Sequence, residues 1–214
     1  MSLLRIASYI LLTILVGCGQ NTAPGIKPEA RLLNDSAVAL IRSSKNEDYQ
    51  KAILLLEKAI AIDTAFVRAY QNKLSFETRL NQYDQALVTS KELNKLRPEN
   101  PDFLMMTGVL YEKNGDSISS VRYFESSLAR YNSILDTINV KTPNYFVVQM
   151  YKGINLILLN RPAAGNQILK SLYDNQADEM YKEALKPFIN GQKQTILENM
   201  FKRQKVTSTS PAKQ

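Results

Sequence analysis

A 34-residue period runs through the sequence from Asp35 to Arg130. Ala52 in DYQKAI returns as Ala86 in QYDQAL, and a further step of 34 reaches Ser120 in DSISSV. Self-similarity at a fixed period of this length is typical of proteins built from stacked repeats. Since a single repeat cannot bury its own apolar face, the units must pack on one another. The period therefore predicts a stack of helical hairpins rather than three separate domains.

The composition agrees with an all-α protein. The chain has 214 residues, of which 44% are apolar and 22% charged, as in ordinary globular proteins. It contains only eight Gly and no Trp, and residues that favour helix, such as Leu, Ala, Lys and Glu, are abundant. We therefore expect helices and no sheet.

Each repeat unit shows two segments with apolar residues at helical spacing. The expected helices are 36–44 and 49–62, 66–80 and 83–96, and 102–113 and 117–131. Turn-forming residues separate the two helices of each unit, at 46–48, 81–82 and 114–116. Asn100 before Pro101 is a favoured helix start, and Asn34 or Asp35 can cap the first helix.

These repeats resemble the tetratricopeptide repeat (TPR) family. In that family a small residue of the second helix packs against its partner helix, followed by a large residue four positions later and a small one after three more. Trp is absent, and Leu74 and Glu77 replace the Gly and aromatic residue of the first helix in the second unit. The structural repeat positions are Ala52, Leu56, Ala59, Ala86, Pro98, Gly108, Tyr111 and Phe124. The resemblance implies a right-handed superhelix of antiparallel hairpins, closed by C-terminal capping helices.

The resemblance also implies a concave groove lined by the first helix of each unit. The family's register assigns it to Ala37, Ile41, Arg68, Gln71, Asn72, Ser75, Arg79, Asp102, Met105, Met106, Val109 and Lys113. Several of these are apolar, and Met adapts to varied partners, so we expect a helix or an extended apolar segment to bind. Some TPR proteins grip a terminal carboxylate; here Asn72 matches, but Ala37, Ile41, Asp102 and Met106 occupy the charged positions, so no such clamp is predicted. The alternative is that C-terminal helices fold back into the groove.

The N-terminus resembles a bacterial lipoprotein signal. Residues 1–17 carry Arg5 and then an uncharged apolar stretch that is shorter than the roughly 20 residues needed to span a bilayer. The order Leu15-Val16-Gly17-Cys18 matches the lipobox, in which the cysteine is acylated and becomes the new N-terminus. We expect residues 1–17 to be removed and 18–31 to form a lipidated, flexible tether. In proteobacterial lipoproteins an Asp after the cysteine is associated with retention in the inner membrane; because Gly19 stands there, the resemblance implies the outer membrane, facing the periplasm.

The period breaks after Arg130. We expect TPR units at about 32–65, 66–99 and 100–131, followed by a divergent region at 132–205. Within it, Thr142-Pro143 starts a helix and 144–175 forms a degenerate fourth hairpin. One or two helices in 177–203, interrupted near Pro187 and Gly191, cap the open end of the stack. The last residues, 206–214, are expected to be disordered.

Charge and chemistry exclude several classes of function. The net charge is +7, but six basic residues and one acid lie from Lys186 onward, so the body is nearly neutral. We predict no nucleic-acid binding, which needs a basic stripe on a folded surface. The chain has no His and one Cys, which excludes His-based nucleophile pairs and His metal sites. No catalytic constellation, metal site or cofactor site is expected.

The sequence therefore predicts a non-enzymatic, lipid-anchored scaffold of the bacterial envelope that binds protein partners through its groove. Similar lipoproteins assist pilus assembly, outer-membrane protein insertion or the placing of peptidoglycan enzymes. A chaperone-like subunit of a secretion or surface machine is the related alternative, and homo-oligomerisation is left open. The alternative from another class is an envelope enzyme or glycan-binding lipoprotein with its site in 131–205.

Overall fold

The structure is a computed structural model that describes residues 25–41, 45–140 and 142–201. Within these ranges it contains ten helices and no strand, so the all-α prediction is confirmed. The helices are α2 (Pro28–Leu40), α3 (Asn46–Ile62), α4 (Val67–Arg79), α5 (Tyr83–Leu96), α6 (Pro101–Lys113), α7 (Ser117–Leu135), α8 (Pro143–Leu158), α9 (Pro162–Asp174), α10 (Glu179–Leu185) and α11 (Lys193–Phe201). The predicted signal peptide, Cys18 and the tail 206–214 lie outside the described residues.

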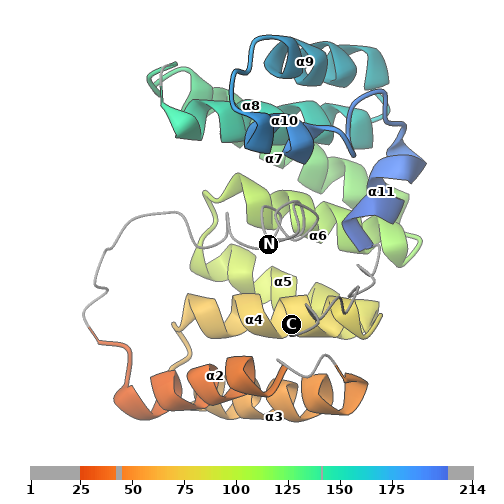
Figure 1. Cartoon of the computed structure of the whole chain (residues 1–214). Coiled ribbons are helices and arrows are strands. Elements are labelled where there is room, and N and C mark those ends of the chain that lie inside the picture. The colour runs from red at the N-terminus through yellow and green to blue at the C-terminus, as the bar shows by residue number, and fades with distance from the viewer. Residues whose placement is uncertain (1–24, 42–44, 141, 202–214) are drawn as a thin grey trace, which may run out of the picture.

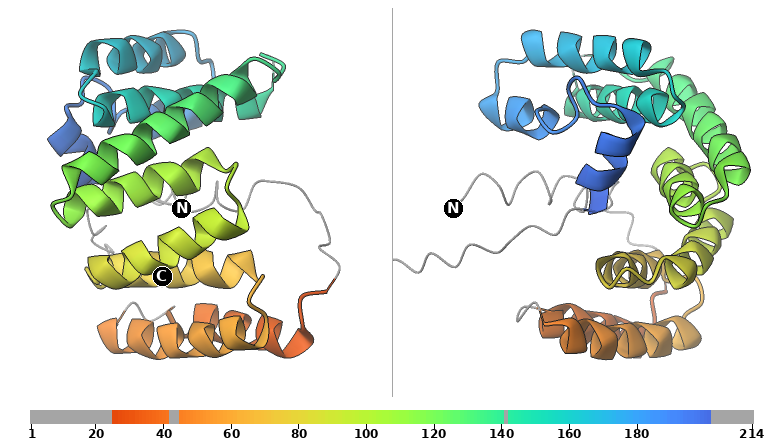
Figure 2. Two further views of the ribbon diagram at one scale, coloured as in Figure 1. Left: turned by 180° about the vertical axis from the view of Figure 1, so that it is seen from behind. Right: turned by 90° about the vertical axis from the view of Figure 1, so that its right-hand side faces the viewer.

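The helices form a curved stack of four hairpins. Successive helices contact one another in the pairs α2 with α3, α4 with α5, α6 with α7 and α8 with α9, and each pair contacts the next. The hairpins follow one another along an arc, and α10 and α11 return to the inner side of that arc (Figures 1 and 2). The architecture is thus a hairpin solenoid in which each unit covers the apolar face of its neighbour.

Small residues at the repeated position allow the helices of a hairpin to approach closely. Ala52, Ala86 and Ser120 are all fully buried. The partner helix contributes Gly108 in the third unit, where an added Cβ would lie 2.7 Å from the Phe124 ring. The large residues that follow, such as Phe124, are also fully buried. The predicted structural positions therefore form the core, except for exposed Pro98 and half-buried Tyr111.

Several helix boundaries follow from capping residues. The Asn100 side chain accepts hydrogen bonds from the backbone N–H groups of Asp102 (2.9 Å) and Phe103 (3.2 Å), as expected for an N-cap. Thr142 caps α8 in the same way, accepting from Tyr145 N. Gly115 has φ +81° in the turn between α6 and α7, a conformation that glycine adopts without steric cost.

The first unit departs from the predicted boundaries. Helix α4 ends at Arg79 and α6 at Lys113, 34 positions apart, but α2 ends at Leu40, five positions earlier than this spacing requires. The helix begins at Pro28, inside the predicted tether, because proline is well suited to the first helical position. The predicted unit boundary at residue 32 is therefore wrong.

The proposed cap of this first helix is also wrong. Asn34 lies in the middle of α2 and is 2% exposed. Its carbonyl accepts a hydrogen bond from Asn72 (2.7 Å) and its amide donates to Asp35 (3.1 Å). Residues 46–48, predicted as a turn, form the first turn of α3, where acidic side chains interact favourably with the helix dipole.

The divergent region folds as predicted into a fourth hairpin followed by two further helices. Helices α10 and α11 lie on the inner side of the arc instead of capping its open end, so the predicted cap is wrong and the alternative, in which C-terminal helices fold back into the groove, holds for α11. Helices α8 and α9 cross at two glycines: a Cβ added to Gly165 would lie 2.4 Å from the carbonyl oxygen of Gly153. The segment around Pro187 and Gly191 separates α10 from α11. The largest buried cluster joins this region to α6 and α7.

We predict that Gly165→Ala destabilises the fold by about 1–3 kcal/mol, the usual range for overpacking a filled core. The added methyl group meets backbone on α8, which cannot move aside as a side chain would. Chemical denaturation followed by circular dichroism measures this change. The control Lys170→Ala, at an exposed position of the same helix, should shift the free energy of unfolding by less than about 0.5 kcal/mol. Equal stability of the two variants would contradict the close crossing.

Candidate functional site

The inner side of the arc is divided into a covered part and an open part. Helix α11 lies across the inner side at the level of α6 and α8 (Figure 2). The inner faces of α2 and α4 lie beyond it. The two parts differ in chemistry, since the apolar groove positions predicted on α6 are in the covered part, whereas the groove positions predicted on α4 are polar.

Aromatic and charged contacts hold α11 in place. The Phe201 ring packs edge to face on Tyr83 of α5, with centroids 5.2 Å apart. The Lys113 ammonium lies 4.9 Å from the centroid of Phe201 and 5.8 Å from that of Tyr83. At the other end of α11, Lys193 Nζ is 2.8 Å from Glu112 Oε1 on α6. Helix α11 thus bridges the second, third and fourth hairpins.

The Glu112–Lys193 ion pair is largely withdrawn from water. Both side chains are 18% exposed. Burial alone would raise the pKa of Glu112, but the hydrogen bond and the charge of Lys193 hold that pKa below its usual value. Glu112 therefore stays ionised and attracts Lys193 throughout the neutral range.

The predicted apolar floor of the groove is not an open surface. Ala37, Met105 and Val109 are 0%, 3% and 0% exposed and belong to the buried core, so their assignment to the groove is wrong. Met106 and Ile41 are partly buried against the core clusters. On α2 the wrong assignment arises because the helix ends five positions earlier than the repeat spacing requires. On α6 it arises because the predicted side chains are buried in the cluster that also includes residues of α11.

Asp102, another predicted groove residue, forms its hydrogen bond with a buried side chain of the core. Tyr131 donates a hydrogen bond of 2.6 Å to Asp102 Oδ1, and the Tyr131 ring stacks on Tyr151 with an interplanar angle of 10°. Burial raises the pKa of Asp102, and the hydrogen bond from Tyr131 offsets part of that rise. Burial also raises the pKa of both tyrosines, with the Asp102 charge adding to it. This cluster joins α6, α7 and α8.

The groove residues predicted on α4 lie together on one face of that helix. Arg68 is exposed, and the remaining four are half-buried: Gln71, Asn72, Ser75 and Arg79. Asn72 reaches Asn34 on α2, and the Arg79 guanidinium lies 5.3 Å from the centroid of the Tyr49 ring on α3. These contacts orient polar side chains along one face of α4.

A cavity of about 370 Å³ lies beside this face, at the end where α2 and α4 begin. Three arginines from separate segments line it, namely Arg31, Arg68 and Arg97, and the lining contains one acid, Asp35. None of the described residues that line it is a lysine. The excess of guanidinium groups makes this cavity suited to anionic side chains, because arginine binds carboxylates through paired hydrogen bonds. Sequence reasoning identified Arg68 but not the other two, which lie outside the family's groove positions.

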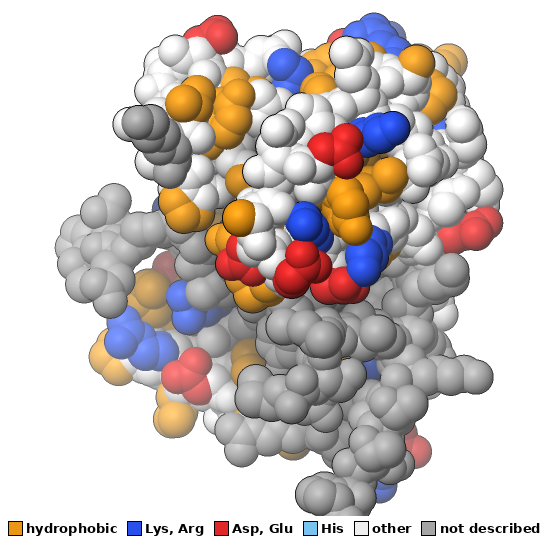
Figure 3. Space-filling view, turned by 45° about the horizontal axis from the view of Figure 1, so that its top comes forward, with side chains coloured by type: hydrophobic (Ala, Val, Ile, Leu, Met, Phe, Trp, Pro, Cys, Tyr) orange, Lys and Arg blue, Asp and Glu red, His pale blue; other side chains and the backbone are white. Residues whose placement is uncertain are grey.

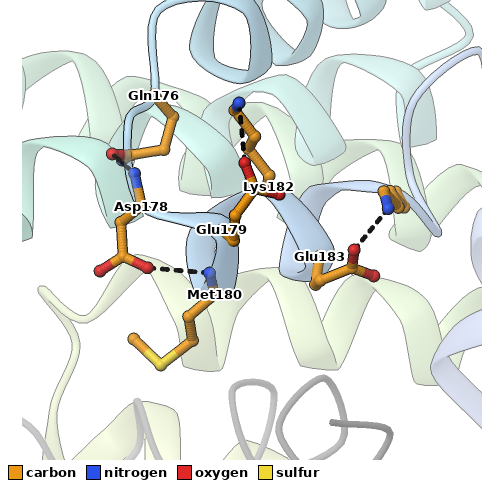
Figure 4. A network of polar contacts seen from close by, with 7 residues as sticks. Gln176, Asp178, Glu179, Met180, Lys182 and Glu183 are labelled. Carbon is orange, nitrogen blue, oxygen red and sulfur yellow. Dashed lines mark hydrogen bonds and ion pairs between the residues drawn. The ribbon is translucent and has the colours of Figure 1, made fainter.

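A second, larger cavity of about 910 Å³ lies between α8, α9 and α10. Sequence reasoning placed an alternative site in this region without naming its residues. The link from α9 to α10 forms one wall, where Gln176 Oε1 accepts from Asp178 N (3.0 Å) and Asp178 Oδ1 accepts from Met180 N (2.8 Å) (Figure 4). Charged side chains of both signs intermingle on the face drawn in Figure 3, so this end has no strong field of one sign.

Neither cavity has the composition of a metal centre. Within residues 25–41, 45–140 and 142–201, no group of three or more His, Cys, Asp and Glu side chains could hold a metal ion. The same ranges contain no helix long and apolar enough to cross a membrane.

Comparison with solved structures identifies the architecture. PilW, a widely conserved type IV pilus biogenesis factor, matches with a TM-score of 0.50 and 18% identity over 71% of this chain and 64% of PilW. A tetratricopeptide repeat protein from Parabacteroides merdae matches with 0.42 and 15% over 86% and 91%. The type III secretion translocator chaperone SycD of Yersinia enterocolitica matches with 0.49 and 13% over 63% and 93%. The chain has a TPR-like helical-repeat fold.

These likenesses concern the fold alone, because the sequences have diverged to identities of 18% or less. No protein-family model matches the chain, and no curated protein sequence matches it significantly. The function must therefore be argued from the site.

We predict that Phe201→Ala loosens α11 without unfolding the stack. The loss of the ring contacts with Tyr83 and Lys113 should lower the free energy of local opening by about 1–2 kcal/mol, which corresponds to roughly 5- to 30-fold faster amide exchange. Hydrogen exchange with mass spectrometry resolves α11 from α2–α9. Thr195→Ala, at an exposed position of α11, is the matched control. Unchanged protection of α11 in the Phe201 variant would show that the ring does not hold the helix.

We predict that Asp102→Asn stabilises the protein at pH 7 by about 1 kcal/mol, because it removes a charge whose burial is unfavourable. The raised pKa of Asp102 means that the wild type recovers this free energy as pH falls toward that pKa. The difference between wild type and variant should therefore shrink as pH falls through the raised pKa of Asp102 toward its ordinary value of 3.8. Tyr131→Phe, which removes the hydrogen-bond donor, should destabilise by about 1–2 kcal/mol. Denaturation midpoints across this pH range test both, and a pH-independent difference would contradict the assignment.

Proposed function

We propose that the protein is a membrane-anchored scaffold of the bacterial envelope that binds protein partners through the open inner face of α2 and α4. The observation that carries this proposal is the division of the inner side: α11 occupies the apolar part, whereas polar and basic side chains remain accessible on α4. A rigid curved stack with an open concave face is suited to binding an extended or helical segment of another protein. We propose no enzymatic activity.

The chemistry of the open face points to an acidic partner segment. Arg31, Arg68 and Arg97 converge on one cavity with a single acid in its lining, and Arg68 is exposed on the adjoining face. Carboxylates on a partner would form charge-assisted hydrogen bonds with these arginines. Complementary charge would also guide the encounter and select against basic partners. We therefore propose that the partner segment is polar and acidic, and not apolar as the sequence led us to expect.

The membrane part of the proposal rests on the sequence. Cys18 follows a short apolar segment in a lipobox-like order, and two or more acyl chains on one residue anchor a protein stably. An attached lipid would hold the arc close to the membrane through the segment before Pro28. We propose that the protein faces the periplasm from the outer membrane, where it assists assembly of an envelope complex.

We predict that a photo-crosslinking residue in place of Ser75, on the open face of α4, captures a discrete partner in cells. The matched control replaces Val88, which is 62% exposed on α5, and should capture little. Adding Arg68→Glu to the Ser75 probe should reduce capture about tenfold, the effect of roughly 1.4 kcal/mol. Mass spectrometry of the crosslinked band identifies the partner and its acidic segment. Equal capture from both probe positions, or capture insensitive to Arg68→Glu, would contradict the proposed surface.

We predict that Cys18→Ala releases the protein from the membrane fraction, because it removes the site of acylation. Metabolic labelling with a fatty acid should mark the wild type and leave the variant unlabelled. Fractionation of envelopes measures the change. Retention of the variant in membranes after a high-salt wash would refute the lipid anchor and leave the α4 surface as a separate question.

A further inference from the structure

The cavity between α8, α9 and α10 is a preformed site with a distinctive lining. We call it the amide pocket, since four of its side chains are carboxamides. It measures about 910 Å³, in the upper part of the range of roughly 300–1,000 Å³ that is usual for small-molecule sites. It is lined by Val140, Thr142, Pro143, Tyr145, Phe146, Gln149, Gln167, Ile168, Ser171, Leu172, Asn175, Gln176, Asp178 and Tyr181.

The lining offers hydrogen bonds but almost no charge. Among the described residues that line it there is no Lys or Arg, and the one acid, Asp178, uses Oδ1 to cap α10. Gln149 donates from Nε2 to the Tyr145 hydroxyl (2.9 Å), which leaves its carbonyl oxygen for a ligand. Gln167 is exposed and has no hydrogen-bond partner among the described residues. An anionic ligand would lose hydration here without gaining an opposite charge from the described residues, and the one charge in the lining, on Asp178, is exposed to water.

Contacts among the walls fix the pocket before any ligand binds. Phe146 packs against Tyr181 with ring centroids 4.7 Å apart, which joins α8 to α10. Asn175 donates to the carbonyl of Ser171 (2.8 Å) and holds the end of α9. The link that follows is fixed by the bonds of Gln176 and Asp178 described above (Figure 4). Such rigid walls reduce the entropy lost when a ligand binds.

The carboxamide and tyrosine side chains of the pocket favour one class of neutral ligand. Three helices form its walls, and most of their backbone groups are hydrogen-bonded within the helices, so recognition falls to side chains. A carboxamide both donates and accepts hydrogen bonds, as a sugar hydroxyl does. The half-buried rings of Tyr145 and Tyr181 add flat apolar surface with a polar tip, which suits the C–H faces of a pyranose ring. An extended peptide would instead require exposed backbone partners or a continuous groove.

We propose that the amide pocket binds a neutral oligosaccharide. Gln149 and Gln167 hydrogen-bond its hydroxyl groups, and the rings of Tyr145 and Tyr181 contact its apolar faces. The pocket lies in the fourth hairpin, whereas the arginine cavity lies in the first two, at the opposite end of the stack (Figure 1). This binding activity goes beyond the scaffold function and does not depend on it.

The test uses the full chain, solubilised from membranes in detergent, and three probes: maltotetraose, cellotetraose and tetra-N-acetylchitotetraose. Isothermal titration calorimetry should detect at least one of them at concentrations up to about 10 mM, a limit that corresponds to roughly −2.7 kcal/mol. Gln149→Ala and Gln167→Ala should each weaken binding about tenfold, the effect of one or two hydrogen bonds. The matched control is Gln85→Ala, an exposed glutamine on α5, which should bind as the wild type does.

Failure of all three tetrasaccharides to bind would overturn the proposal, as would binding that neither glutamine substitution weakens. Binding of a neutral octapeptide of Gly and Ser in their place would reassign the pocket to peptides. Arg68→Glu, which disturbs the partner surface, should leave sugar binding intact, and Gln149→Ala should leave partner capture intact. The two proposals therefore succeed or fail separately.

Discussion

The close approach of paired helices at small residues is the constraint on which the rest of the structure depends. Ala52, Ala86 and Ser120 recur at one position and are fully buried, while Gly153 and Gly165 perform the same task in the fourth hairpin. Where the backbones nearly touch, the large neighbouring side chains interdigitate and the hairpins adopt a common spacing. The arc, its inner face and both cavities follow from that repeated spacing.

Buried polar contacts fix the register of neighbouring helices. Asn155 on α8 is fully buried and donates to the carbonyl of Phe124 on α7 (2.8 Å). Ser127 on α7 donates to the carbonyl of Pro101 on α6 (2.8 Å). Since an unpaired polar group costs free energy in such an environment, these bonds favour one register between neighbouring helices. They add specificity to a stack that apolar burial alone would hold in several registers.

The sequence was sufficient to predict the helices that obey the repeat, because periodicity and caps are local signals. Helices α4 to α6 begin and end within one residue of their predicted bounds. It failed at α2, where Asn34 has the character of a helix cap and is instead paired with Asn72, 38 positions away. The family's register selected residues on α4 that remain at least partly exposed, but it also placed the buried side chains of Met105 and Val109 in a groove. Nothing local in the sequence shows that these two side chains are buried in one cluster with residues of α8 and α11, and the carboxamides of the amide pocket are brought together only by the tertiary fold.

The return of α11 to the inner side has a consequence for how the chain reaches this structure. Contacts between neighbouring helices join residues close in sequence, and such contacts form quickly. The Phe201–Tyr83 contact joins residues 118 positions apart, and closing so long a loop is entropically costly. The arc can therefore assemble hairpin by hairpin while α11 docks last, once Met106 and Lys113 are already in place beneath it. As the chain emerges with its N-terminus first into the compartment where it folds, the inner face at α6 would remain uncovered until the final residues of α11 are free to dock.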